Sequence, residues 1–293
     1  MVEFRQPRAL AEALALLGPQ TALIGGGTDL LGRPSWLEGK RLLVDLTRVA
    51  ELLGVSQDEE GALIIGAAVT HQEISTHPLV IQHARLLALA CARVGSIQIR
   101  HRGTLGGNLG NGSPAADSLP ALACLEAEVR LAAAEGPRRV PVLSLLASPG
   151  QTVLTSGELI ESVRIPLRKG ARAVFFEKAG QRKGMCCSKA SVAFSACRRS
   201  DKTFADVRLA MGAVGPNVIR VPQAERLLEG QPLEPGRIAE MAQACVRAAR
   251  PIDDIRSSAA YRTHVVGALL QEGLLGLLDQ GARPRKASGS RPR

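Results

Sequence analysis

The sequence predicts an α+β protein built from two parts. Short apolar strands alternate with amphipathic helices up to about residue 170. The composition changes near 169–171, and after it strand-like segments punctuated by turn residues are followed by a run of helical segments. A length of 293 residues suits about two domains, because one domain commonly holds about 100–200 residues.

The first part is expected to begin with a helix over 7–17, since Leu10, Ala13, Leu14 and Leu17 fall on one helical face. Short apolar runs predict strands at 21–24, 41–47 and 62–70. Further helices are expected over 78–94 and 118–129, on either side of a glycine-rich segment that is expected to be a loop. The alternation of 158–167 predicts a strand that closes this part.

The second part is expected to combine a small antiparallel sheet with packed helices. Strands are predicted at 172–179, 188–199 and 204–215, and helices at 221–230, 235–249 and 259–280. The last thirteen residues, 281–293, carry five of the ten net positive charges and no acid. We expect this basic tail to be disordered.

Composition argues against several classes of protein. A net charge of +10 invites a nucleic-acid interpretation, but half of it lies in the tail. Aromatic residues make up only 2% of the chain, whereas nucleic-acid modules commonly use aromatic side chains for stacking. No apolar run reaches the length of a transmembrane helix, so membrane insertion is not expected. Glu12 interrupts the apolar N-terminal run, which argues against a signal peptide and predicts a cytoplasmic protein.

The known catalytic and phosphate-binding signatures are missing from the sequence. There is no P-loop, no G-x-S-x-G elbow, no H-E-x-x-H and no C-x-x-C, so hydrolase and metal-centre interpretations lose support. The stretch GNGSPA at 110–115 fits a dinucleotide fingerprint in form. A continuous apolar strand should lead into such a fingerprint, and the segment before 110 is not one.

Two glycine clusters remain, LIGGGTDL at 23–30 and TLGGN at 104–108. Glycines allow backbone N–H groups to approach an anion closely, and successive N–H groups form an anion-binding nest. Thr28, Thr104 and Asn108 add side-chain donors, and Asp117 adds an acceptor for a sugar hydroxyl. Two facing nests would clamp a pyrophosphate. The alternative is that both clusters are ordinary turns, which also use glycine.

The sequence resembles the flavin-binding subunits of the molybdenum hydroxylases, the xanthine dehydrogenase and carbon monoxide dehydrogenase family. The motifs LIGGGTDLL and IRHRGTLGGNLGNGSPAAD look like the two segments with which this family binds the pyrophosphate of FAD. The segments GELIESVRIP, FFEKAGQRK, RLAMGAVGPNVIR and SSAAYRTHVVGALL follow in the family's order. The resemblance covers nearly the whole chain and is nearest to the separate FAD subunit of bacterial xanthine dehydrogenases.

This resemblance implies a two-lobed FAD-binding domain over 1–170, of the type found in vanillyl-alcohol oxidase, and a C-terminal sheet-plus-helices domain over 175–280. It implies non-covalent FAD, with Asp117 on a hydroxyl of the cofactor, Ile160 near the flavin ring, and Lys178 reaching the flavin from the second domain. Val94 stands where relatives carry an aromatic residue, so the ring would pack on aliphatic side chains or on Phe175 and Phe176. The remaining implied contacts to FAD are Leu23, Ile24, Gly25, Gly26, Gly27, Thr28, Asp29, Leu30, Thr104, Gly107 and Asn108.

The implied function is electron transfer within a complex, with no catalytic residue of its own. A large subunit would carry molybdopterin, a small subunit would carry [2Fe-2S] clusters, and this chain would pass electrons from FAD to NAD as hydride. Carbon monoxide, aldehyde or N-heterocycle dehydrogenases are alternatives within the family. A free-standing flavin reductase and a non-catalytic nucleotide-binding module are the alternatives outside it.

Overall fold

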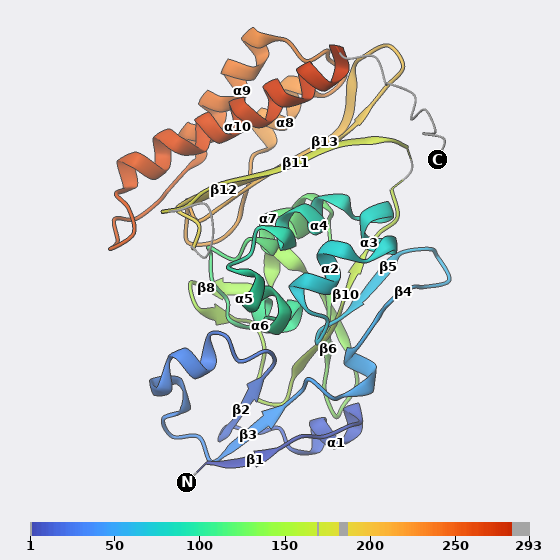
Figure 1. Cartoon of the computed structure of the whole chain (residues 1–293), viewed down its shortest axis with the longest axis vertical. Helices are drawn as coiled ribbons and strands as arrows, with labels where there is room; N and C mark the ends of the chain where they lie inside the picture. Colours follow the sequence, from blue (N-terminus) through green and yellow to red (C-terminus); the bar gives the residue numbers. More distant parts are fainter. Residues whose placement is uncertain (1, 169, 182–186, 283–293) are drawn as a thin grey trace, which may run out of the picture.

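The computed structural model describes residues 2–168, 170–181 and 187–282, and it arranges them in successive layers (Figure 1). A three-stranded sheet lies at the N-terminal end, followed by a five-stranded sheet covered by short helices. A four-stranded sheet lies beyond those helices, and the three helices that follow it in the sequence cover its outer face. This mixture of helices and largely antiparallel sheets confirms the predicted α+β class.

The first sheet is parallel, with the order β1-β3-β2. Helix α1 makes the connection from β1 to β2, and its buried Ala13 packs in a small core with residues that include Leu52 and Leu159. The bounds are β1 Glu3–Arg5, α1 Leu10–Ala15, β2 Thr21–Ile24 and β3 Leu42–Asp45. Helix α1 is shorter at both ends than the helix predicted over 7–17.

The second sheet is antiparallel, with the order β4-β5-β10-β6-β7. Its strands are β4 Val55–Gln57, β5 Leu63–Gly66, β6 Glu128–Ala132, β7 Arg138–Pro141 and β10 Leu159–Ile165. Its helices are α2 His71–Thr76, α3 Pro78–His83, α4 Arg85–Ala92, α5 Ile97–Arg102, α6 Leu105–Gly110 and α7 Ser118–Cys124. A short hairpin, β8 Leu146–Ser148 and β9 Gln151–Thr152, lies beside α5 and α6 (Figure 1).

Three local predictions for this part are wrong. The helix expected over 78–94 breaks at Ala84, which has φ −137° and ψ 44°, and becomes α3 and α4. The helix expected over 118–129 ends at Cys124, because Glu126 turns the chain at φ 52° and leads it into β6. The glycine-rich segment expected to be a loop contains the end of α5 and all of α6, whose first turn is capped by Thr104.

The C-terminal part is the predicted antiparallel sheet with helices. The sheet has the order β11-β12-β13-β14, and alternate residues of β11 face opposite sides of it. Phe176 belongs to the core shared with α4 and α7, whereas Phe175 belongs to the core under α8–α10. The bounds are β11 Arg172–Ala179, β12 Ala190–Arg198, β13 Phe204–Gly212, β14 Ile219–Arg220, α8 Pro222–Leu228, α9 Pro235–Ala248 and α10 Ala259–Ala282.

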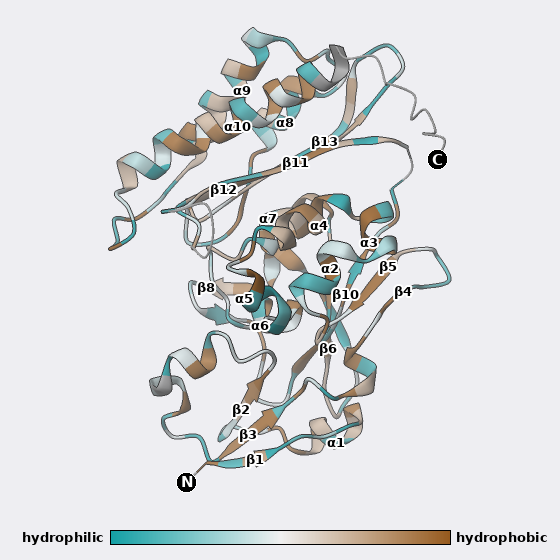
Figure 2. Ribbon diagram, viewed as in Figure 1, coloured by the Kyte–Doolittle hydropathy of each residue, from teal (hydrophilic) through white to brown (hydrophobic). Residues whose placement is uncertain are grey.

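Figure 2 shows hydrophobic residues concentrated along α4, α7 and β5, which lie in the interior between the layers. None of the helices in the described part of the chain combines the length and hydropathy that crossing a membrane requires. The basic tail predicted over 281–293 lies, apart from the end of α10, outside the described residues.

Candidate functional site

A cavity of about 550 Å³ lies between the three-stranded sheet and the helices α5 and α6. Sites for small molecules and cofactors commonly have volumes of roughly 300–1,000 Å³, so the cavity is of the right size for one. Its walls come from segments far apart in the sequence. They include β2 and the turn after it, the N-terminal half of α6, and Ile160 of β10.

The turn after β2 presents backbone donors to this cavity. The chain leaves the sheet at Ile24, and Gly27 adopts φ +74°, a conformation that residues with a Cβ rarely take. Among the described residues, none accepts a hydrogen bond from the backbone N–H groups of this turn. These N–H groups belong to Gly25, Gly26, Gly27, Thr28 and Asp29. Neighbouring N–H groups without protein acceptors form the kind of nest that binds anions.

Close packing against α5 and α6 fixes the position of this turn. A Cβ on Gly26 would lie 1.7 Å from the carbonyl oxygen of Arg102, and a Cβ on Gly25 would lie 2.5 Å from Oγ1 of Thr104. Only glycine fits at these two positions without moving the backbone or the threonine. The two glycine clusters, 74 or more residues apart in the sequence, therefore lie in contact.

The second cluster does not offer a matching nest, and the expectation that it would is wrong. The N–H of Leu105 donates to Val69 O at 2.9 Å, and that of Gly106 donates to Ala67 O at 2.8 Å. The N–H of Gly107 donates to Oγ1 of Thr104 at 3.1 Å. These bonds use the first donors of α6 inside the protein. A Cβ on Gly106 would lie 2.6 Å from Cβ of Ala67, so this glycine permits close packing.

Side chains of the second cluster still line the cavity. Asn108 accepts a hydrogen bond from Oγ of the buried Ser118 at 2.6 Å through its Oδ1, which leaves its amide group as a donor. Asn111 donates from Nδ2 to Oδ2 of Asp29 at 3.1 Å and thereby ties the two clusters together. The polar side chains on this wall are thus oriented by contacts within the protein.

Asp117 and Lys178 lie outside the lining of the cavity and contact each other. Nζ of Lys178 lies 2.6 Å from Oδ2 of Asp117, and Oγ of Ser188 donates to Oδ1 of Asp117 at 2.5 Å. Both side chains are buried, Asp117 next to α7 and Lys178 on β11. Burial raises the pKa of the Asp117 carboxyl, and the charge and hydrogen bonds of Lys178 and Ser188 oppose this rise. The pair joins the two parts of the chain.

Apolar side chains line the rest of the cavity. Val94, Ile99 and Ile160 contribute to it, together with Leu23, Ile24 and Leu30 of the first cluster. Phe175 and Phe176 do not, because Phe175 stacks on Phe194 at 5.2 Å in one core and Phe176 lies in another. The idea that either phenylalanine packs on a ligand in this cavity is therefore wrong.

Residues 1–168 match the family described as FAD binding domain in molybdopterin dehydrogenase. The chain belongs to this family. Residues 175–277 of this flavoprotein subunit match the CO dehydrogenase flavoprotein C-terminal domain. Relatives in this family are oxidoreductase subunits, and in their complexes the partner subunits carry molybdopterin and iron–sulfur clusters.

The flavoprotein subunit is similar over nearly its whole length to several relatives, and these relatives are named for different substrates. It is 28% identical to the xanthine dehydrogenase FAD-binding subunit of Escherichia coli O157:H7, over 92% of this chain and 93% of the relative. It is 30% identical to the nicotine 6-hydroxylase medium subunit of Paenarthrobacter nicotinovorans, over 96% and 98%. The structure of carbon monoxide dehydrogenase from Hydrogenophaga pseudoflava superimposes with a TM-score of 0.88 at 27% identity, over 95% and 98%.

The cavity fits FAD, the cofactor of this family. The first glycine cluster offers N–H groups for a doubly charged pyrophosphate, and the cradle around Gly25 and Gly26 has no room for a Cβ. Apolar walls beside the cluster suit the ring systems at the two ends of the cofactor.

The lining also contains residues that sequence reasoning missed, Trp36 and His71 among them. Trp36 is the single tryptophan of the chain, and Cζ of Arg33 lies 4.6 Å from its ring centroid. His71 is buried at the first position of α2. In the sequence, Trp36 stands in a polar loop and His71 in a helix-start motif. Neither pattern distinguishes a residue that lines a cavity from an ordinary one.

Proposed function

We propose that this chain binds FAD in the cavity, accepts electrons from an iron–sulfur subunit and passes them to NAD as hydride. The observation that carries the proposal is the row of backbone N–H groups from Gly25 to Asp29, which belong to residues that line the cavity and have no acceptor among the described residues. Bound FAD supplies the redox chemistry, since it exchanges single electrons with iron–sulfur clusters and hydride with nicotinamides. The protein supplies binding, orientation and local charge.

In this proposal the residues predicted from the sequence contact different parts of FAD. The glycine turn holds the pyrophosphate, and the hydroxyls of Thr28 and Thr104 and the amide of Asn108 donate to its oxygens or to neighbouring hydroxyls. Gly107 has no side chain, so the backbone of α6 can approach the cofactor beside Thr104 and Asn108. Ile160, with Val94 and Ile99 also on the apolar wall, packs against a ring of the cofactor.

Asp117 and Lys178 act at the junction of the two parts. A carboxylate has about four acceptor positions, so Asp117 can bind a hydroxyl of FAD while it still holds Lys178 and Ser188. Lys178 provides positive charge near the negative charge that FAD gains on reduction. We place the boundary between the FAD-binding domain, 1–170, and the C-terminal domain, 175–280, at the end of the connection between β10 and β11 and the first residues of β11.

The proposed role of Lys178 predicts a change in redox potential. Replacing Lys178 with Met removes the positive charge and keeps Asp117, so it should lower the two-electron potential by roughly 20–40 mV, since 30 mV corresponds to about 1.4 kcal/mol. NADH should also reduce the flavin more slowly. Lys189→Met is the matched control, because Lys189 lies at the start of the same sheet and contacts the ring of Tyr261. An unchanged potential in Lys178→Met would refute this role.

The proposed substrate class is that of a xanthine dehydrogenase. It rests on the similarity to such a subunit, which covers 92% of this chain and 93% of the relative. Relatives named for nicotine and carbon monoxide are equally similar, which supports the view that the hydroxylated substrate is chosen by the molybdenum subunit. The cytoplasmic location and the NAD acceptor remain predictions.

One experiment tests the proposed function directly. The chain is purified, its cofactor is released by heat and identified by chromatography, and NADH is added under anaerobic conditions. Release of FAD and bleaching of the yellow protein by NADH are the expected results. FAD that NADH does not reduce would contradict the NAD acceptor and favour another, such as a quinone. Failure to bind added FAD would overturn the proposal. Turnover of a substrate without partner subunits would instead support a free-standing reductase.

A further inference from the structure

A buried histidine, whose imidazole makes no hydrogen bond to the described residues, lines the proposed FAD cavity. His71 is the first residue of α2 and is 2% exposed. Its backbone N–H donates to the carbonyl oxygen of Gly103 at 3.0 Å, which fixes its position. Its imidazole reaches the cavity wall next to the glycine turn.

The imidazole has no hydrogen-bond partner in the described part of the chain. Nδ1 of His71 is buried and has no hydrogen-bond partner among the described residues. Because Nδ1 is enclosed, Nε2 is the ring nitrogen that can reach a ligand in the cavity, and no residue in the described part of the chain bonds to it. Burial, with the nearby charge of Arg100, lowers the pKa of His71 to about 4, so the ring is neutral near pH 7. A neutral ring carries one N–H donor, and since Nδ1 is enclosed, we assign the proton to Nε2.

His71 lies directly beside the nest. Cδ2 of His71 is 3.3 Å, and Oγ1 of Thr28 is 3.5 Å, from the position that a Cβ on Gly103 would take. The imidazole edge and the Thr28 side chain therefore meet over the same glycine. The N–H of Thr28 is one of the donors without a protein acceptor. An anion held by those donors would lie within reach of the imidazole edge.

We propose that Nε2–H of His71 donates a hydrogen bond to the pyrophosphate of FAD. It does so on the side of the cavity where the first N–H groups of α6 already donate inside the protein. This inference rests on the proposed binding of FAD. A neutral donor suits the position, because a buried ammonium or guanidinium group would cost far more to remove from water in the protein without FAD. Arg100, on α5, lies near enough to His71 for its charge to act on the imidazole, and the same positive charge favours an anion there.

The test compares three substitutions of His71 by their affinity for FAD. His71→Leu should weaken binding by about 10- to 100-fold, the range expected when a hydrogen bond to a charged group is lost. His71→Gln, whose amide nitrogen reaches the place of Nε2, should stay within about threefold of the wild type. His71→Asn places its amide near Nδ1 instead and should bind as poorly as the leucine variant. Equal affinity for FAD in all four proteins would overturn the proposal.

The stability of the FAD-free protein separates this role from a structural one. His71→Leu removes a buried polar group that has no partner among the described residues. The melting temperature of the FAD-free variant should therefore equal or exceed that of the wild type. A fall in melting temperature together with unchanged FAD affinity would mean that His71 is a packing residue. His77→Leu is the matched control, since Nδ1 of His77 also lacks a partner among the described residues but lies outside the cavity lining. Its FAD affinity should be unchanged.

A fragment of the cofactor locates the contact. ADP contains the pyrophosphate, so His71→Leu should lower the affinity for ADP, measured by competition with FAD, by the same factor as the affinity for FAD. The affinity for riboflavin, which has no pyrophosphate, should be unaffected. A lower affinity for FAD with an unchanged affinity for ADP would mean that His71 contacts another part of the cofactor, and this would overturn the assignment. If the wild-type protein itself binds no FAD, the proposed function fails. If the wild type binds FAD and His71→Leu binds it equally well, only the role of His71 fails.

Discussion

At the scale of single residues, the site depends on glycines that allow close approach of two backbones. Gly26 and Arg102 meet with no space for a side chain, and this contact holds the N–H groups of the turn in place. The contact cannot be recognised in the sequence, because a glycine in a turn and a glycine under another backbone look alike. The sequence predicted that Gly26 matters, and the structure supplies the reason.

Replacing Gly26 with Ala should damage both stability and cofactor binding. The new Cβ would lie 1.7 Å from the carbonyl oxygen of Arg102, so the backbone must move. We expect the free energy of unfolding to fall by about 1–3 kcal/mol, as for overpacking elsewhere, and FAD affinity to fall about tenfold or more. Gly32→Ala is the control, because a Cβ there meets nothing within 4 Å. Thermal unfolding and FAD titration of both variants check this, and equal behaviour would contradict it.

At the scale of elements, the sequence predicts strands better than it predicts the glycine-rich helices. The apolar residues of β10–β13 are largely buried, and these strands were found with nearly their predicted bounds. From the sequence, the segment around α6 is predicted to be a loop, because glycine has a low helix propensity. Tertiary contacts override that preference, since Thr104 caps the helix and Gly106 packs on Ala67. The cavity itself could be predicted only as two clusters, because its walls come from distant segments.

An ion pair at the edge of the second sheet holds one wall of the cavity. Glu158 accepts two hydrogen bonds from Arg138 of β7 and one from the N–H of Thr155. Arg138 also donates to the carbonyl oxygen of Val153 at 3.1 Å. Segment 153–158 is thereby fixed to β7, and Thr155 and Glu158 line the cavity.

This ion pair predicts how stability depends on pH. The hydrogen bond from Arg138 lowers the pKa of Glu158 from its usual value near 4.5 to about 2 in the folded protein. Its contribution to stability is thus present above pH 4.5 and is lost as the pH falls towards 2. Glu158→Gln should remove this part of the acid dependence, so its melting temperature should fall less between pH 4.5 and 2.5 than that of the wild type. Parallel curves for the two proteins would contradict the prediction.

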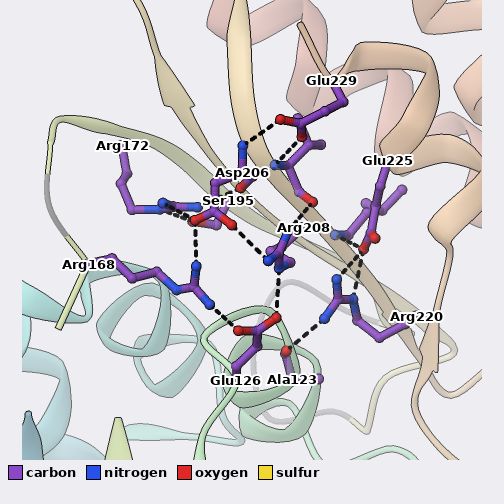
Figure 3. A network of polar contacts seen from close by, with 12 residues as sticks. Ala123, Glu126, Arg168, Arg172, Ser195, Asp206, Arg208, Arg220, Glu225 and Glu229 are labelled. Atoms are coloured by element: carbon purple, nitrogen blue, oxygen red, sulfur yellow. Dashed lines mark hydrogen bonds and ion pairs between the residues drawn. The ribbon is translucent and has the colours of Figure 1, made fainter. Parts of the chain in front are cut away.

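At the scale of the whole molecule, charged side chains connect the N-terminal and C-terminal parts (Figure 3). Glu126, at the end of α7, accepts hydrogen bonds from Arg168 in the connecting segment and from Arg208 of β13. Asp206, also on β13, accepts from Arg168 and from Arg172 at 2.7 Å. Burial raises the pKa of Glu126, but the two arginines outweigh it and hold the pKa below its usual value. The network adds to the apolar contacts that α7 makes with the C-terminal sheet.

Loss of this network should weaken the junction without affecting the FAD cavity. Glu126→Gln should lower the melting temperature at low salt by about 2 °C, because partly exposed ion pairs contribute about 1 kcal/mol or less and such a change shifts a protein of this size by a few degrees. The difference should shrink in 0.5 M NaCl, which screens the charges. Glu240→Gln, on the exposed face of α9, should show no change.

Addition of FAD distinguishes the junction from the cavity in the same experiment. A ligand that binds only the folded protein stabilises it by about 2.7 kcal/mol at a hundred times its dissociation constant. Glu126 is not part of the cavity lining, so FAD should raise the melting temperature of Glu126→Gln and of the wild type by the same amount. For Gly26→Ala the rise should be smaller at the same FAD concentration. An equal rise in all three proteins would mean that the glycine turn does not hold the cofactor.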